Sequence, residues 1–479
     1  MQRRDFIRLS TRTALALGLS GMGSPLWAGS TTTTPKTLIH VMLDGGPDFR
    51  HLIVPAYESS NNDAESYAAK FWSARASLFR VSTATELKEV YRNYYDEIEI
   101  DGVKCGILKQ ASWLKSEIAQ GRVAIISNAI GSTNRNHHHA KLMIESGNMN
   151  SSPYNQDVSG WMGRAASGLK QTVVSVTSEV RLLCNGPHPT DIQRHDNSCV
   201  VNNYESREVG LYEYDTQADL DSGSSSYKYS ENAIMSRALK SYYEAKRGSI
   251  PTNSPYYKAM QHEQRLRTFG RQVKTRLDAN PIPQKILNLS EANHIDKLHS
   301  HYLATEIGSV YDSFVTQDIF DMRLMSMEVN GWDSHKNLRN QIEPKYEDMF
   351  GENRGFHALV DSLNAIDTAL YENTLIVFSG EFGRQHKSNG DHGNDHGRGN
   401  TVLVMGGAIK KGGLYGDLFP ESEKPYLDVK NADIEGKTSM LKIYSTLLEW
   451  QQQGLGEAVF GTLSTHSVES GVVLSDMFG

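Results

Sequence analysis

The sequence predicts an α/β fold, in which helices cover both faces of a mostly parallel sheet. Short runs rich in apolar and β-branched residues alternate with stretches long enough for a helix, which is typical of parallel strands joined by helical crossovers. Of the 479 residues, 38% are apolar and 22% are charged, as in ordinary globular proteins. This composition argues against disorder, collagen, a coiled coil and a multi-span membrane protein.

Residues 1–28 have the features of an export signal. The pair Arg3-Arg4 follows a short start, and a mildly apolar stretch broken by glycines covers residues 14–27. Paired arginines at this position are an address for the twin-arginine route, which exports proteins that are already folded. The glycines disfavour the alternative, an amphipathic N-terminal helix. We therefore expect contact with the twin-arginine export machinery, a periplasmic or secreted mature chain, and no membrane span in that chain.

Removal of this signal leaves 451 residues and a more acidic protein. The signal contains four arginines and one aspartate, so the formal net charge moves from −7 to −10. A nucleic acid partner requires a basic surface, so we expect no nucleic acid partner for this acidic chain. The three cysteines form no C-x-x-C pair, which argues against a zinc ribbon and a thioredoxin-like motif.

The folded part is expected to begin at residue 37, after a polar linker at 29–36. The first strand covers 37–43 and ends at Asp44-Gly45-Gly46-Pro47, a turn sequence that contains an acid. Five similar strands are expected at 123–127, 172–177, 324–329, 374–379 and 401–405. Residues 205–320 differ, because they are rich in tyrosine and charge and have apolar residues at helical spacing. This pattern predicts a polar helical insertion.

Acids and histidines follow several of these strands, where an open α/β sheet has its binding crevice. Mixed carboxylate and imidazole ligands suit zinc, manganese or iron, whereas oxygen ligands alone suit calcium or magnesium. Any one of these residues could instead be a turn or cap residue. Their shared position at strand ends predicts one metal or phosphate-like site. The candidates are Asp44, Asp48, Asp333, His335, Glu381, Arg384, Asp395 and His396.

The last two candidates lie in a glycine-rich segment, residues 389–399, which contains two Asp-His pairs. Its glycines exclude a regular helix, so its histidines are expected to be loop residues.

A second cluster, Asn136-His137, opens a predicted helix that ends near Gly147. The helix follows the strand at 123–127, so its positive N-terminal end would face the crevice and suit an anion or a nucleophile. The alternative is purely structural, because Asn is a favoured N-cap and Gly a favoured C-terminal stop. Of the three consecutive histidines at 137–139, at most two can face one site, because neighbours on a helix point in different directions.

Several motifs together resemble the exported bacterial family called domain of unknown function 1501. The resemblance runs from the signal to about residue 417, is weakest across 205–320, and is most specific at GWDSH and at EFGR with DHGRG. That family is similar in fold to the alkaline-phosphatase-like superfamily of phosphatases, sulfatases, phosphodiesterases and phosphomutases. The resemblance implies an alkaline-phosphatase-like three-layer sandwich over 37–479. Its motifs are RRDFIR, LDGGPDFRHLIVP, NHHHAKLMIESGN, SGWMGRA, GWDSHKN and TLIVFSGEFGRQHKSNGDHGNDHGRGN.

The resemblance also implies one or two divalent metal ions, with zinc, manganese, calcium and magnesium as candidates. Asp44 falls where the superfamily has its first metal-binding Asp, Glu381 where it has another Asp, and Asp395-His396 resembles a later ligand pair. The implied metal ligands are Asp44, Asp48, Asp333, His335, Glu381, Asp395 and His396.

The implied catalytic residues are Asn136, His137 and Arg384, with Arg384 balancing charge on the transferred group. Two departures from the superfamily pattern affect this assignment. Phe382 stands where dimetal members have a histidine, which weakens or removes one metal site. Asn136 stands where a hydroxyl nucleophile is expected, which argues against a covalent intermediate and leaves a metal-activated water or a neighbouring hydroxyl to attack.

The expected function is therefore an exported metal-dependent hydrolase of phosphate or sulfate esters. Its substrate would be a small anionic ester or an ester linked to a polysaccharide or lipid. A non-catalytic exported binding or assembly protein on the same fold is one alternative, which the two departures permit. A metal-dependent mutase is the other, and product analysis separates it from a hydrolase.

Overall fold

The fold is seen in a computed structural model. It describes residues 34–57, 64–151, 158–176, 181–186, 198–200, 241–242, 245, 272–273, 275–291, 297–320 and 322–479. The predicted export signal and most of the predicted insertion at 205–320 lie outside the described residues. Within the described ranges, no helix is both long enough and apolar enough to cross a membrane.

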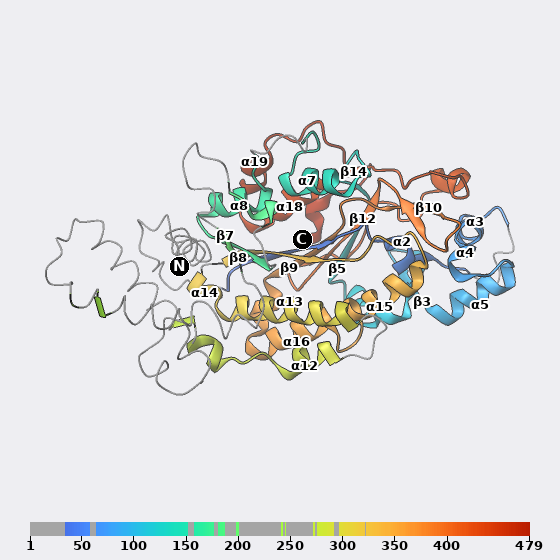
Figure 1. The fold of residues 1–479 in the computed structure, drawn as a ribbon. Helices are drawn as coiled ribbons and strands as arrows, with labels where there is room; N and C mark the ends of the chain where they lie inside the picture. The colour runs from blue at the N-terminus through green and yellow to red at the C-terminus, as the bar shows by residue number, and fades with distance from the viewer. Residues whose placement is uncertain are drawn as a thin grey trace.

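A nine-stranded sheet forms the centre of the fold (Figure 1). The strand order is β13-β5-β12-β9-β1-β8-β6-β7, and β14 pairs with β5. Strand β12 is antiparallel to both β9 and β5, and the other pairs are parallel. The predicted mostly parallel α/β fold is confirmed. In the sheet order and with β14 last, the bounds are Gly413–Tyr415, Val123–Ile130, Asn400–Met405, Thr374–Ser379, Thr37–Leu43, Met322–Val329, Thr172–Val176, Ser198–Val200 and Thr438–Ser439.

Helices cover both faces of this sheet. In Figure 1, α7, α8, α18 and α19 lie above it, and α12, α13, α15 and α16 lie below it. Alternate side chains of β1 enter two separate hydrophobic cores, with Leu38 and Met42 in one and Ile39 and Val41 in the other. The fold is therefore a three-layer sandwich. The upper helices are His137–Ser146, Trp161–Leu169, Met440–Gln451 and Leu455–Phe460, and the lower ones are Gln284–Leu287, Lys297–Val315, Leu338–Phe350 and Gly355–Ile366.

The central strands β1, β9 and β12 are buried along their whole length. Burial on both faces explains why their sequences are continuous apolar runs instead of alternating patterns. His40 of β1 is the titratable residue in these three strands, and its Nε2 lies 3.0 Å from Ser379 Oγ. Burial, with a smaller contribution from Arg181, lowers the pKa of His40 to about 3, so the imidazole is neutral.

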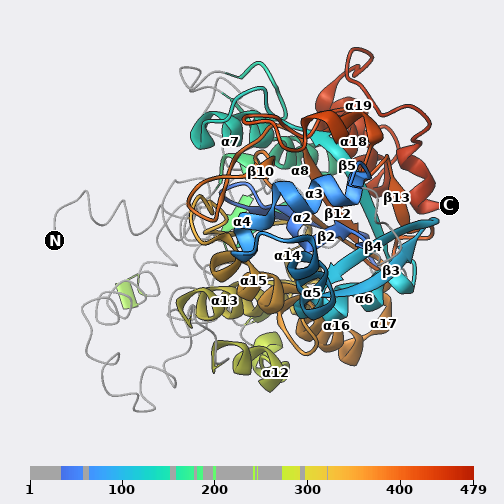
Figure 2. The same cartoon turned by 90° about the vertical axis from the view of Figure 1, so that its right-hand side faces the viewer.

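A smaller antiparallel sheet, in the order β2-β4-β3, packs with short helices at one end of the molecule (Figures 1 and 2). These strands were not predicted from the sequence, although Asp101-Gly102 between β3 and β4 is a typical hairpin turn with positive φ at both residues. The bounds are Ile53–Pro55 for β2, Tyr95–Ile100 for β3 and Val103–Leu108 for β4, with α2 at Phe49–Leu52, α3 at Tyr67–Ala74, α4 at Ala76–Phe79, α5 at Ala84–Tyr94 and α6 at Ser112–Ala119.

The described part of 205–320 is largely helical, and its longest helix belongs to the sandwich. Helix α13 packs against β6, β8 and α16, and its Ile307 and Val310 are fully buried. Helices α14, Gln317–Phe320, and α17, Thr368–Glu372, precede β8 and β9.

Phe378 of β9 provides a test of the lower core. Its ring is fully buried and makes edge contacts with Phe350 and Phe356, at centroid distances of 5.0 and 4.8 Å. Phe378→Ala should lower the free energy of unfolding by about 3–5 kcal/mol, because it leaves a cavity between the sheet and two helices. Chemical denaturation measures this. The control Ile366→Ala, at a side chain 44% exposed, should change it by less than about 0.5 kcal/mol. Equal losses in the two variants would contradict this packing.

Candidate functional site

The loops that follow β1, β5, β8 and β9 meet at one edge of the sheet. Strands β5 and β9 point the same way because each is antiparallel to β12, and β12 begins at that edge. The four loops and the segment before β12 bring together the predicted residues Asp44, His137, Asp333, Glu381, Asp395 and His396.

The loops after β1 and β8 are joined through their main chains. Asp44 N–H donates to Val329 O at 2.9 Å, and Trp332 N–H donates to Asp44 O at 3.0 Å. Gly45, with φ +118°, permits this approach, because a Cβ there would lie 2.3 Å from the backbone nitrogen of Asp333. A larger residue at position 45 would separate the two loops.

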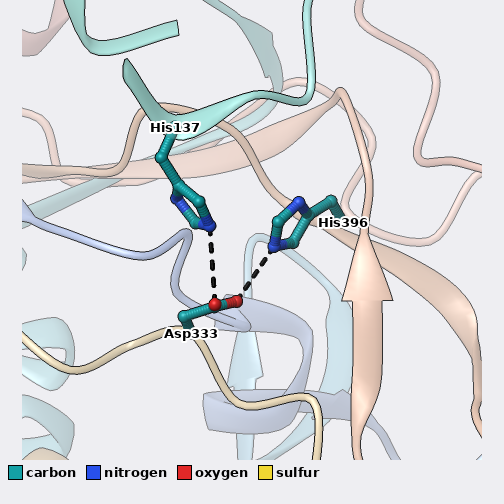
Figure 3. A group of neighbouring side chains, drawn as sticks. All are labelled: His137, Asp333 and His396. Carbon is teal, nitrogen blue, oxygen red and sulfur yellow. Dashed lines mark hydrogen bonds and ion pairs between the residues drawn. The ribbon is translucent and has the colours of Figure 1, made fainter.

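His137, Asp333 and His396 form the centre of the site (Figure 3). Each offers one ligand atom, and these atoms lie within 4.8 Å of one another. Asp333 lies between the two imidazoles, with Oδ2 3.5 Å from His137 Nε2 and Oδ1 2.9 Å from His396 Nε2. Such a group is close enough to bind one cation.

His335 lies beside this group. Its Nε2 is 3.1 Å from Asp333 Oδ1 and 2.9 Å from His396 Nε2. The Nε2 atoms of all three histidines therefore point towards the carboxylate of Asp333.

The other nitrogen of each imidazole, Nδ1, has an acceptor of its own. An acceptor at Nδ1 favours the tautomer that is protonated there, so each Nε2 presents a lone pair. Three lone pairs and a carboxylate that face one another repel unless protons or a metal cation lie between them. The acceptors are Glu381 Oε1 for His137 at 2.7 Å, Asp395 Oδ1 for His335 at 2.9 Å and the Arg135 carbonyl for His396 at 3.0 Å.

Glu381 lies behind His137. Its side chain is fully buried, and its oxygens accept N–H donors from Gly45 at 2.9 Å and Gly46 at 3.2 Å as well as His137 Nδ1. Both oxygens are therefore occupied, and Glu381 orients an imidazole instead of joining the central group. Asp395 has the corresponding place behind His335.

Arg384 is also buried and does not face the crevice. Its guanidinium donates to the carbonyls of Gly45, Gly46, Trp332 and Asn394 and, at 2.9 Å, to Asp333 Oδ1. It anchors the loops and positions Asp333, which corrects the contact with the transferred group that the family resemblance implied for it.

Two other predicted residues, Asp48 and Asn136, have contacts that stabilise the fold and do not join the central group. Asp48 is buried against Arg75, with Oδ2 2.7 Å from Nη1. Burial opposes ionisation of Asp48, but Arg75 outweighs it and lowers the carboxyl pKa. Asn136 is the N-cap of α7, where its Oδ1 accepts the His139 N–H at 3.1 Å. In the structure Asn136 therefore caps the helix, which is the structural alternative considered for it above.

Asp44 pairs with Lys141, a residue that the sequence motifs did not single out. Lys141 Nζ lies 3.2 Å from Asp44 Oδ1 and 2.9 Å from Glu328 Oε1, and Arg181 Nε lies 3.2 Å from Glu328 Oε2. Lys141 therefore pairs with both carboxylates, and Arg181 divides its guanidinium between Glu328 and Glu145. An acid in the apolar strand at 322–329 was the only sequence signal for Glu328.

Phe382 fills the space between the histidines. It is buried, and its ring centroid lies 4.9 Å from that of His137 and 4.5 Å from that of His396. At this position the molecule has an apolar wall that lowers the local dielectric and strengthens the charge interactions around Asp333.

The glycine-rich segment is a hairpin, which corrects the expectation of a loop throughout. Strands β10, Arg384–Ser388, and β11, Asn394–His396, are antiparallel and pair Arg384 with His396. His392 lies in the connecting turn at φ 57°, where its Nδ1 is 2.7 Å from Ser77 O. The hairpin directs His396 to the site and His392 away from it.

The pKa values of His137, Asp333 and His396 are shifted from those of the free side chains. Hydrogen bonding and charge from Glu381 raise the pKa of His137. Burial raises the pKa of Asp333, but hydrogen bonds from His396 and Arg384 outweigh it and lower this pKa to about 2. Burial lowers the pKa of His396. Asp333 is therefore ionised at neutral pH, and its carboxylate faces the Nε2 atoms of the three imidazoles.

Comparison with known protein families agrees with the motifs. Residues 318–449 match the family described as "Protein of unknown function (DUF1501)", the family that the sequence resembles. The matched range includes Asp333, Glu381 and His396 but not His137. No curated protein matches the chain. The family prediction is confirmed over this range, and the wider superfamily stays a prediction.

The contact between Glu381 and His137 predicts a pH effect. In metal-free protein, His137 should titrate above the usual imidazole pKa of about 6.5. A raised folded-state pKa means that the pair stabilises the fold below about pH 6.5 and loses this contribution as pH rises through the raised pKa. NMR titration of the histidine ring protons in the presence of a chelator measures it.

Glu381→Gln should remove the upward shift of the His137 pKa, because a neutral amide does not stabilise an imidazolium. Glu352→Gln is the control, because this carboxylate is exposed and lies 3.5 Å from another imidazole, His357 Nδ1. A wild-type His137 pKa at or below the usual value would contradict the assigned pairing.

Proposed function

We propose that the protein binds one divalent cation through His137, Asp333 and His396 and hydrolyses phosphate or sulfate esters. The convergence of imidazole Nε2 atoms on the Asp333 carboxylate, with every Nδ1 already bonded, is the observation that supports this most directly. A bare arrangement of this kind is electrostatically costly, and a cation removes the cost.

The donor set favours one class of metal. Two imidazoles and one carboxylate suit zinc or manganese better than calcium or magnesium, which prefer oxygen ligands alone. Three protein ligands also leave room for substrate, as in catalytic zinc sites. A cation bound there would polarise an ester oxygen and lower the pKa of a water molecule towards ~7.

One ion per chain is expected. Asp44 and Glu328 are two further carboxylates beside the crevice. However, Lys141 lies within 3.2 Å of both, and Arg181 lies within 3.2 Å of Glu328. A second divalent cation would have to displace these charges.

Direct attack by water fits the surroundings better than a covalent intermediate. Ser132 is fully buried, and its hydroxyl donates to Asn134 O at 2.9 Å. We assign proton transfer to His335, whose Nδ1 is held by Asp395 and whose Nε2 faces the same space as Asp333. Glu381 positions His137 and Arg384 positions Asp333, and both are bonded to the Gly45-Gly46 turn.

The central test measures bound metal and ester hydrolysis in the same variants. His137→Ala and His396→Ala should each weaken zinc binding by at least about 100-fold and abolish hydrolysis of aryl phosphate or sulfate esters. His335→Ala should retain the metal and lose at least about 100-fold in kcat. His138→Ala is the matched control, because this exposed neighbour lies outside the central group. Metal content by elemental analysis and initial rates measure these effects.

The outcomes separate the alternatives. Protein without metal after preparation free of chelator would contradict the proposal. Metal-loaded protein that hydrolyses no ester would favour a binding protein on the same fold, and an isomerised product would favour a mutase.

We further propose export by the twin-arginine route to the periplasm or beyond, on the evidence of Arg3-Arg4. The double change Arg3→Lys with Arg4→Lys should leave the precursor in the cytoplasm, because the route reads the arginine pair as an address. Cell fractionation measures this, and an unchanged periplasmic yield would refute the route.

A further inference from the structure

Beyond the cation site, we infer that Arg135 and Arg398, both held by Asp433, bind a second anionic group of the substrate. This inference rests on the proposed function and specifies its substrate class. The expected substrate is an ester with at least one additional sulfate, phosphate or carboxylate group.

The three residues form a compact, charged unit. Asp433 Oδ2 accepts hydrogen bonds from Arg398 Nε at 2.8 Å and from Arg135 Nη2. The Asp433 side chain is only 6% exposed, whereas those of Arg135 and Arg398 are 34% and 56% exposed. Two guanidinium groups share one carboxylate, so among the described residues one positive charge is left without an acidic partner and is accessible to solvent.

This unit is connected to the candidate cation site. Arg135 lies two residues before His137, and Arg398 lies two residues after His396. The Arg135 carbonyl is also the acceptor for His396 Nδ1, at 3.0 Å. The main-chain segment of Asp433 is fixed, because the neighbouring Ile434 O accepts the Gly399 N–H at 3.2 Å. The arginines are therefore positioned by the same segments that position the proposed ligands.

The chemistry favours an oxyanion as the ligand. Guanidinium groups present several N–H donors in one plane, which match the oxygens of sulfate, phosphate and carboxylate. In the described part of the chain, each arginine side chain makes one hydrogen bond, so other N–H groups can reach a ligand. An ordinary surface ion pair has one base per acid and leaves no such charge.

Inorganic sulfate is the probe for this subsite, with binding measured by isothermal titration calorimetry on the whole protein as purified and again after chelation. Arg135→Gln and Arg398→Gln should each weaken sulfate binding by about tenfold in both preparations, because each removes charge-assisted hydrogen bonds. Arg398→Lys should bind with intermediate affinity, since an ammonium retains the charge without the planar donors.

Arg122→Gln is the matched control, because Arg122 is 43% exposed, lies 3.7 Å from Glu117 and precedes β5 at the opposite edge of the sheet. It should bind sulfate as the wild type does. Equal sulfate affinity in wild type and both subsite variants, with unchanged thermal unfolding, would overturn the inference. Arginine-dependent sulfate binding in protein that takes up no metal would refute the proposed hydrolase alone.

Discussion

The Gly45-Gly46 turn is held between two buried charges, and the rest of the site depends on this arrangement. Glu381 accepts the N–H groups of both glycines, and Arg384 donates to both of their carbonyls. Arg384 also bonds Asp333, so one guanidinium joins the loops after β1 and β8 to the β10–β11 hairpin. Burial makes these charge-assisted bonds strong and makes loss of either partner costly.

The chemistry of the site follows from this rigidity. Because the loops are fixed, the imidazoles of His137 and His396 approach Asp333 with their lone pairs forward, which is the geometry that a cation requires. Lys141 and Arg181 already pair with Asp44 and Glu328 nearby, whereas the Asp333 carboxylate, which Arg384 positions, faces the imidazoles. Charge placed in this way favours one cation between the histidines over two cations across the crevice.

The sequence was a good guide to the sheet and a partial guide to the site. Buried parallel strands are continuous apolar runs, so the central strands were predicted within a few residues. The hairpins that turn at Asp101-Gly102 and at Asn389-Gly390 were missed because their turn signals were not used. Strand-end position suggested a set of acids and histidines, most of which lie together in the structure, whereas Asp48 is buried against Arg75. It does not determine which side chain faces the crevice, so it could not separate the central Asp333 from the buried Glu381 and Arg384.

The most direct test of the central claim is anomalous X-ray diffraction at the absorption edge of zinc or manganese, on crystals of protein prepared without chelator. The account predicts a single anomalous peak about 2.0–2.2 Å from His137 Nε2, His396 Nε2 and an oxygen of Asp333. No peak at this position, or a peak between Asp44 and Glu328 with Lys141 displaced, would contradict it.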